Sequence, residues 1–233
     1  MVKELIINAS PNGVTIALLQ DKQLVELNKE QINNNYAVGD IYLGKVKKIM
    51  PGLNACFVDV GYEKDAFLHY FDLGSQIHSL IKLTKLIKNG TYKDNLLDRL
   101  KLEPDINKSG KISEILSRNM LIPVQIVKEP ISTKGPRLST DISIAGRFVV
   151  LVPFSDTISI SKKIRSNVER TRLRKIVEGI KPKNFGVIIR TVSEDKGVAE
   201  LEKDLLALIA KWETFSGKLT STEPSKRIVG GMG

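Results

Sequence analysis

Short apolar stretches with alternating polar positions, separated by turn residues, fill the first 71 residues of the chain. A period of two is typical of β-strands that bury one face. Three strands are expected before residue 36, at 2–8, 14–19 and 23–28. Turn residues at 11–13 and 21–22 join them into an antiparallel meander.

A second group of strands follows the polar segment that ends at Gly39. Five strands are expected here, at 41–50, 53–61, 64–71, 120–128 and 135–142. Five short strands with Gly and Pro turns favour a small barrel of the OB type, spanning residues 37–142. Residues 72–119 interrupt this barrel, with helical spacing at 80–88 and 94–100 on either side of a breaker near Pro104. This pattern predicts a partly helical, mobile insertion.

Strands and helices alternate in the last third of the chain. Strands are expected at 147–154, 158–164 and 184–192, and helices at 167–180 and 197–215. The meander has too few strands to be stable alone, so we expect it to complete one sheet with residues 143–216. The predicted fold is mixed α+β: an α/β subdomain of residues 1–36 and 143–216, the barrel inserted in it, and a linker at 217–233.

Composition and charge narrow the possible functions. The 233 residues include 36 Lys+Arg and 26 Asp+Glu, a net charge of +10. No apolar run reaches the length of about 18 residues that spans a membrane, and the N-terminus lacks the apolar core of a secretory signal. One cysteine, Cys56, with His69 and His78, cannot form a disulfide or a His/Cys zinc site within the chain. We therefore expect a soluble, cytoplasmic protein without a cofactor or metal of its own, and a polyanionic partner.

Residues 160–183 concentrate the positive charge. They hold nine Lys+Arg and two Glu, a balance of +7. A solvated helix usually mixes the two signs to form ion pairs along its surface. The excess predicts a surface that faces phosphates, with binding that weakens as salt rises. An ordinary basic surface helix is the alternative.

Two phenylalanines are predicted to face outward from the barrel. A period of two in residues 53–61 puts Cys56, Val58 and Val60 inside and Phe57 outside, and the same pattern puts Phe67 outside in the next strand. Outward rings on neighbouring strands form a platform on which bases stack, worth about 1–3 kcal/mol per base. The alternative is that both rings cap the core or pack under the 72–119 insertion.

Two segments carry a resemblance to known RNA-binding and RNA-cleaving proteins. Residues 38–71 (VGDIYLGKVKKIMPGLNACFVDVGYEKDAFLHYF) resemble the RNA-binding OB-fold module of the ribosomal S-one type. Residues 139–191, with STDISIAGRFVVLVP, ISISKKI and GVIIRT, resemble the ribonuclease E/G family in the same order and spacing. The resemblance covers about residues 2–228. It implies an RNase H-like subdomain with the barrel inserted, then a 5′-end sensor and a DNase I-like catalytic domain.

The resemblance implies a binding site for single-stranded RNA in the barrel. Phe57, Phe67 and Lys128 would hold the strand. The two phenylalanines agree with the alternation, whereas Lys128 falls on the same parity as Val124 and Ile126, and so must lie past the strand's end. The RNA path is expected to continue over the basic segment, through Lys162, Lys163 and Arg170.

A second implied site is a pocket for a 5′-monophosphate. Arg190 and Thr191, in GVIIRT, would bind the phosphate, because arginine offers a bidentate fork and threonine a hydroxyl donor. Gly135 and Thr140 would line the same pocket. The alternative is an arginine at a strand end beside a helix-capping threonine. The implied function is single-stranded RNA binding and 5′-monophosphate sensing within an endoribonuclease of RNA processing and decay.

Catalysis is not expected from these residues. An RNase H-type nuclease needs clustered carboxylates for two metal ions, and the first strand offers only Glu4. In the family, the Mg²⁺-binding carboxylates and the homo-oligomer contacts belong to a catalytic half that would follow Lys226. The expectation is a fragment or truncated gene product that binds RNA without cutting it. Two alternatives stay open: a stand-alone OB-fold RNA-binding protein, such as a translation or ribosome-assembly factor, and an enzyme with a metal site at a sheet edge.

Overall fold

The computed structural model describes the whole chain except residues 1, 11–12, 32–34, 93–96 and 232–233. Its contacts divide the chain into two compact units, residues 1–36 and residues 37–233.

The first unit is the predicted antiparallel meander. Its strands are β1 (Lys3–Ser10), β2 (Gly13–Gln20) and β3 (Gln23–Gln31). They form a three-stranded sheet in the order β1-β2-β3, and the described part of the chain contains no pairing between them and another sheet. Most of the predicted turn at 11–13 lies outside the described residues. That the meander belongs to an RNase H-like subdomain stays a prediction.

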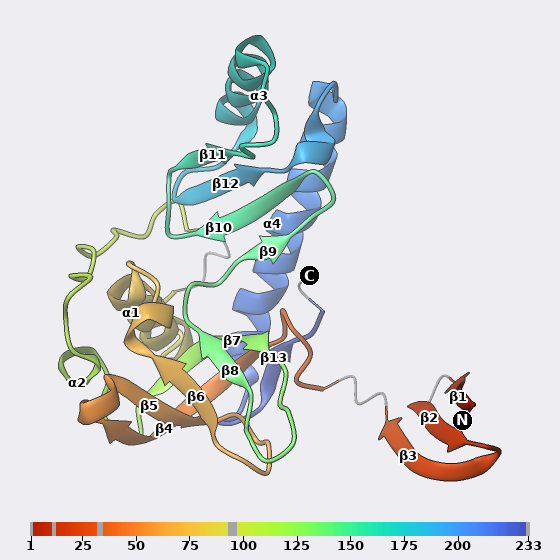
Figure 1. The fold of residues 1–233 in the computed structure, drawn as a ribbon. Helices are drawn as coiled ribbons and strands as arrows, with labels where there is room; N and C mark the ends of the chain where they lie inside the picture. The colour runs from red at the N-terminus through yellow and green to blue at the C-terminus, as the bar shows by residue number, and fades with distance from the viewer. Residues whose placement is uncertain (1, 11–12, 32–34, 93–96, 232–233) are drawn as a thin grey trace. The chain divides into compact units, whose positions relative to one another are not determined.

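The second unit contains the predicted barrel, which is confirmed as closed and five-stranded (Figure 1). Its strands are β4 (Ile41–Met50), β5 (Ala55–Asp59), β6 (Ala66–His69), β7 (Leu121–Lys128) and β8 (Arg137–Ser139). The order is β4-β5-β6-β8-β7, and pairing of β7 with β4 closes the barrel. The inward positions are apolar and fully buried, among them Val46, Val58, Leu68, Val124 and Leu138.

The insertion between β6 and β7 is partly helical, as predicted, and its described residues pack against the rest of the unit. Helix α1 (Ile77–Lys88) covers the predicted helix at 80–88 and buries its apolar face, which packs against β7 and against α4 (Val198–Ser221). Asn54 and Asn184 fasten the insertion further: the Asn54 amide donates to the carbonyl of Gly110, and the Asn184 amide to the carbonyls of residues 97 and 100. A short helix α2 (Ile112–Ile115) precedes β7. Residues 97–100 are not helical, and the rest of the helix predicted at 94–100 lies outside the described residues.

A four-stranded sheet follows the barrel. Its order is β11-β12-β10-β9, with strands β9 (Ile144–Ala145), β10 (Val149–Pro153), β11 (Ile158–Ile160) and β12 (Phe185–Ile189). Helix α3 (Asn167–Ile180) joins β11 to β12, and the long helix α4 packs on one face of the sheet (Figure 1). Trp212 on α4 is fully buried and contacts the rings of Phe154, Phe185 and Phe215. These helices and strands match the predicted alternation.

Within the predicted linker at 217–233, residues 217–221 and 227–229 form regular structure. Helix α4 continues to Ser221 with Leu219 fully buried, and β13 (Arg227–Val229) pairs with β4 at the edge of the barrel sheet. Ile228 and Val229 are buried there. Burial of these apolar side chains on the barrel and α1 stabilises the segment, because it removes apolar surface from water. The Gly-rich end of the sequence does not indicate this stabilisation, because the partners are distant in the chain.

Candidate nucleic-acid interface

Two phenylalanines lie on the same outer face of the barrel. Phe57 on β5 is opposite Phe67 on β6 in the ladder, and the ring centroids are 6.0 Å apart in a T-shaped arrangement. Both residues are half-buried, whereas the alternating inward positions are fully buried, namely Cys56, Val58, Ala66 and Leu68. The predicted alternation is confirmed for these strands, except that Ala55, on the parity of Phe57, is also buried.

Lys128 joins this face through an irregularity of β7. The register shifts between Ile126 and Lys128, so that Lys128 lies opposite Arg137, the residue paired with Phe67. A bulge inserts one residue in the ladder and thereby changes the face to which the next side chain belongs. Lys128 is therefore exposed, although uninterrupted alternation would have buried it with Val124.

A groove of about 690 Å³ brings these residues together. Phe57, Phe67, Lys128 and Gly135, four of the predicted site residues, line it. Sequence reasoning overlooked three cations of the same groove, Lys64, Lys134 and Arg137. For Lys134 and Arg137 the signal is the KGPR segment at 134–137, shortly after the β7 strand, and Lys64 lies just before Phe67 in the chain.

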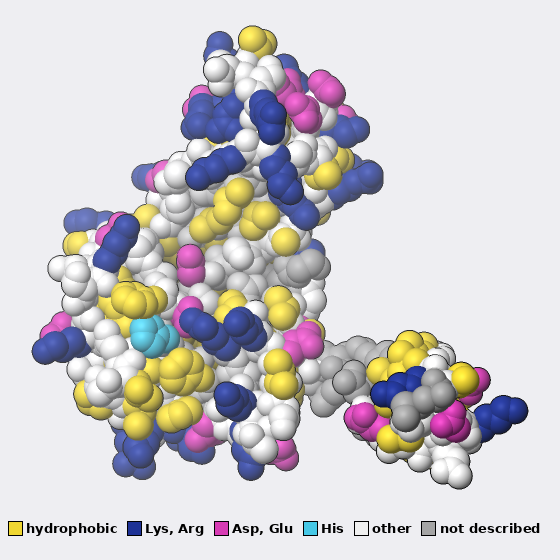
Figure 2. Space-filling view, viewed as in Figure 1, with side chains coloured by type: hydrophobic (Ala, Val, Ile, Leu, Met, Phe, Trp, Pro, Cys, Tyr) yellow, Lys and Arg dark blue, Asp and Glu magenta, His cyan; other side chains and the backbone are white. Residues whose placement is uncertain are grey.

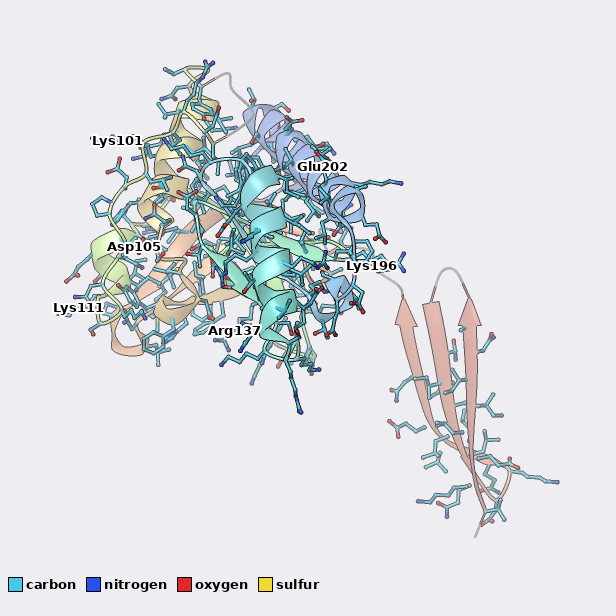
Figure 3. The ribbon with its side chains drawn as sticks, turned by 90° about the horizontal axis from the view of Figure 1, so that it is seen from above. Lys101, Asp105, Lys111, Arg137, Lys196 and Glu202 are labelled. Carbon is cyan, nitrogen blue, oxygen red and sulfur yellow. The ribbon has the colours of Figure 1, made fainter. Side chains whose placement is uncertain are left out.

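Arg137, labelled in Figure 3, is fixed in position at the groove. Its Nε and Nη2 donate to the two oxygens of Asp72 at 2.9 and 3.0 Å. The remaining N–H groups of the guanidinium have no hydrogen-bond partner among the described residues, and the side chain is 42% exposed. Arg137 can therefore donate to a ligand while Asp72 holds its plane.

Only glycine fits at position 135, because the backbone of another segment packs closely against it. A Cβ atom at this position would lie 2.3 Å from the Asp65 carbonyl oxygen and 2.8 Å from that of Lys64. Both neighbours are backbone atoms, so they cannot rotate away. The absence of a side chain lets the loop 131–135 approach the β5–β6 connection and form one wall of the groove.

Arg190 and Thr191 lie together at the end of β12. The Arg190 backbone N–H donates to the Phe148 carbonyl at 2.9 Å, and its guanidinium donates to the Gly146 carbonyl. Thr191 begins a short 3₁₀ turn, and its hydroxyl lies 2.8 Å from the Ser161 hydroxyl. Arg190 is exposed and Thr191 half-buried, so both remain accessible at this end of the sheet.

The β11–α3 loop carries the remaining predicted cations. Arg170 donates from Nη1 to the carbonyls of Ser161 and Ile164, at 2.8 and 3.2 Å, and so holds the loop in shape. Lys162 and Lys163 are exposed on that loop. Because Ser161 contacts both Thr191 and Arg170, the structure brings all five predicted residues of this half of the chain to one end of the sheet.

The contacts of Gly135 and Thr140 are with other groups. Gly135 belongs to the barrel groove, and the buried Thr140 hydroxyl accepts from the backbone N–H of Gly74 at 3.0 Å. Within the described residues no hydrogen bond joins either of them to Arg190. That they line one phosphate pocket with Arg190 stays a prediction.

The basic segment 160–183 is only partly neutralised. Arg172 pairs with Glu169, Lys181 pairs with Asp156, and Arg174 donates to the Ile158 carbonyl. The exposed cations that form no ion pair with another described residue are Lys162, Lys163, Arg165, Arg174, Lys175 and Lys183. Figure 2 shows lysine and arginine side chains gathered over α3 and the sheet beside it.

The described residues contain no group of three or more His, Cys, Asp or Glu side chains that could hold a metal ion. Among the same residues, no helix is both long and apolar enough to cross a membrane.

Comparison with known proteins identifies the family. Residues 143–232 match the model of the ribonuclease E/G family. The chain is 34% identical over 212 residues to ribonuclease G of Escherichia coli, covering 91% of this chain and 40% of that protein. It is also 34% identical to ribonuclease G of Haemophilus influenzae over 97% of this chain, and to ribonuclease E of a Nostoc species over 88%. These matches cover 42% and 26% of the two relatives.

The chain therefore belongs to the ribonuclease E/G family. It spans about 40% of the length of the ribonuclease G relatives that it matches.

Proposed function

We propose that these residues bind single-stranded RNA and recognise a 5′-monophosphate end, within an endoribonuclease of RNA processing and decay. The observation that carries the proposal is the groove in which Phe57, Phe67 and Lys128 meet. Membership of a ribonuclease family supports RNA as the ligand. The proposal assigns no cleavage step and no metal ligand to the residues described here.

The barrel groove supplies the two interactions that a single strand needs. Aromatic rings that keep one part open to solvent, as the half-buried Phe57 and Phe67 do, can stack on bases of any sequence, and each stacked base is worth about 1–3 kcal/mol. Lys128, with the other groove cations Lys64, Lys134 and Arg137, can neutralise the phosphates between the bases. We therefore expect binding that is strong at low salt, weak at high salt and nearly independent of RNA sequence.

The end of the β9–β12 sheet supports recognition of a terminal phosphate. Arg190 is exposed, and its hydrogen bond to Gly146 fixes the guanidinium while other N–H groups stay available. Thr191 adds a hydroxyl held by Ser161, and Lys162 and Lys163 add charge on the neighbouring loop. A monophosphate carries more charge than a 5′-hydroxyl and can accept from these groups, so it should be preferred.

The test compares one short RNA with a 5′-monophosphate or a 5′-hydroxyl, at two salt concentrations with Mg²⁺ present, and monitors RNA integrity. Wild-type protein should bind the monophosphate more tightly without cutting it. Arg190→Ala should remove the preference, whereas Lys203→Ala, a matched change on the exposed surface of α4, should keep it. Phe57→Ala should weaken both RNAs alike, because it acts on stacking and not on the end.

A second candidate is an RNA-binding protein that reads no 5′ end, such as a translation or ribosome-assembly factor. It is favoured by the barrel groove, which can hold RNA without Arg190. Equal, salt-sensitive binding of the two RNAs would support this candidate and refute 5′ sensing. Cleavage by the 233-residue chain would contradict both.

A further inference from the structure

The aromatic face of the barrel does not stop at Phe67. The ring of His69, two residues further along β6, lies 6.4 Å from the Phe67 ring. The ring of Phe71 lies 5.0 Å from that of His69, with an angle of 48° between their planes. Phe57, Phe67, His69 and Phe71 therefore form a continuous row of four rings, which we call the ring row.

Phe71 is the most exposed large apolar residue of the barrel, at 77%. A single exposed apolar side chain is ordinary on a protein surface. Phe71 differs because it continues a row of rings whose first two members, Phe57 and Phe67, line the groove. That groove has four cations (Lys64, Lys128, Lys134 and Arg137) and two carboxylates (Asp65 and Glu129) in its lining. Figure 2 shows hydrophobic and basic side chains side by side over the barrel.

The backbone around Phe71 is held from three directions. The Phe71 N–H donates to His69 Nδ1 at 3.1 Å, at the start of the 3₁₀ turn Tyr70–Asp72. Tyr70 is buried beneath this turn, and its hydroxyl donates to the Asn107 carbonyl. Asp72 is clamped to Arg137, as described above. The Phe71 ring is thus presented on a fixed turn, which lowers the entropy lost when a ligand binds to it.

The hydrogen bond from the Phe71 N–H also determines the tautomer of a neutral His69. Since Nδ1 accepts from the Phe71 N–H, the neutral imidazole must carry its proton on Nε2. His69 can therefore stack on a base and donate a hydrogen bond in the same row. Arg137, paired with Phe67 in the ladder and bonded to Asp72 beside Phe71, supplies a cation along the row.

On these grounds we propose that Phe71 is an additional base-stacking position, which lengthens the single-stranded binding site beyond Phe57 and Phe67. The inference rests on the proposed RNA-binding function of the barrel. The ligand it implies is a single-stranded nucleic acid, because flat rings in series with interleaved cations match successive bases and phosphates.

The experiment measures affinity for oligouridylates lengthened one nucleotide at a time, from about 3 to about 12 nucleotides, a range that brackets the sites of OB folds. The affinity of the wild-type protein should increase by one distinct step at the RNA length that reaches Phe71. Phe71→Ala should abolish this increase, so that its affinity for longer RNAs is about fivefold or more below that of the wild type. Its affinity for shorter RNAs should be unchanged. Leu206→Ala is the matched control, since Leu206 is a 59% exposed apolar residue on α4.

A second variant locates the contact directly. Phe71→Trp keeps a flat ring, so it should retain the step, and its exposed indole should be quenched only by RNAs long enough to reach it. The native Trp212 is fully buried and serves as the unquenched reference.

Two results would overturn the inference. The first is Phe71→Ala binding that equals wild type at every length, and the second is an equal loss at every length, which would mean that Phe71 merely supports the other rings. Phe57→Ala separates the hypotheses: if it weakens binding while Phe71→Ala does not, only the added position fails. If neither variant weakens binding, the proposed function fails as well.

Discussion

Asp204 on α4 holds the turn that supports Arg190, and its replacement by alanine tests how the phosphate end of the sheet is built. The carboxylate accepts from the backbone N–H groups of Arg147, Phe148 and Val149, at 3.2, 2.8 and 3.0 Å. The same turn offers its Gly146 and Phe148 carbonyls to Arg190. Asp204 therefore links α4 to the β9–β10 turn and, through it, to Arg190.

The expected loss follows from these three bonds. A hydrogen bond to a charged group contributes about 1.5–3 kcal/mol to stability. Three bonds to one carboxylate do not add fully, and water can reach the turn once the carboxylate is gone, so we expect Asp204→Ala to lower the free energy of unfolding by about 2–4 kcal/mol. For a unit of this size, that loss corresponds to a fall in Tm of roughly 5–15 °C. Asp204→Asn keeps one acceptor oxygen and should give an intermediate loss.

Urea unfolding followed by circular dichroism measures the stability. Glu202→Ala is the control, because Glu202 is an exposed carboxylate on the same helix (Figure 3). If the 5′-end proposal holds, Asp204→Ala should also reduce the preference for a 5′-monophosphate while it leaves binding to 5′-hydroxyl RNA unchanged. A stability loss below about 0.5 kcal/mol, or one equal to that of Glu202→Ala, would mean that Asp204 does not hold the turn.

Three further predictions concern stability and reactivity. The hydrogen bond from Arg172, aided by the Asp195 backbone N–H, lowers the pKa of Glu169 from 4.5 to about 2. Because the pKa of Glu169 is lower in the folded state than in the unfolded state, its stabilising effect is complete above about pH 4.5 and is lost as the pH falls towards 2. Glu169→Gln should therefore reduce the change in the free energy of unfolding between these pH values, measured by urea unfolding. An unchanged pH dependence would contradict this prediction. Trp212→Ala should lower the free energy of unfolding by about 3–5 kcal/mol, measured by thermal unfolding. Trp212→Phe should lower it clearly less, because the buried indole Nε1 has no hydrogen-bond partner among the described residues that the change could remove. Equal losses for the two variants would contradict this prediction. Burial raises the pKa of Cys56 to about 12. Iodoacetamide at pH 8 should therefore label the thiol only after the protein unfolds, which mass spectrometry can measure. Rapid labelling of the native protein would show that the thiol is not buried.

Much of the local structure could be predicted from patterns of neighbouring residues. The period of two in residues 55–59 and 66–69 was sufficient to put Phe57 and Phe67 on the outer face, because successive side chains of a strand must alternate. The apolar stripe of α4 identified Trp212 as a core residue for the equivalent reason in a helix. Family membership was also predicted from the motifs and is confirmed by comparison.

Which of these elements contact one another depends on packing between distant parts of the chain. Lys128 reaches the groove through a register shift against β8, and Gly135 lies at the barrel because the loop that carries it packs on the backbone of Asp65. Residues 217–229 form a helix end and a strand, although their composition indicates a linker, because Leu219 and Ile228 find buried positions on distant elements. Alternation and capping depend on neighbours in sequence, whereas register, loop packing and burial depend on partners tens of residues away, which no local pattern specifies.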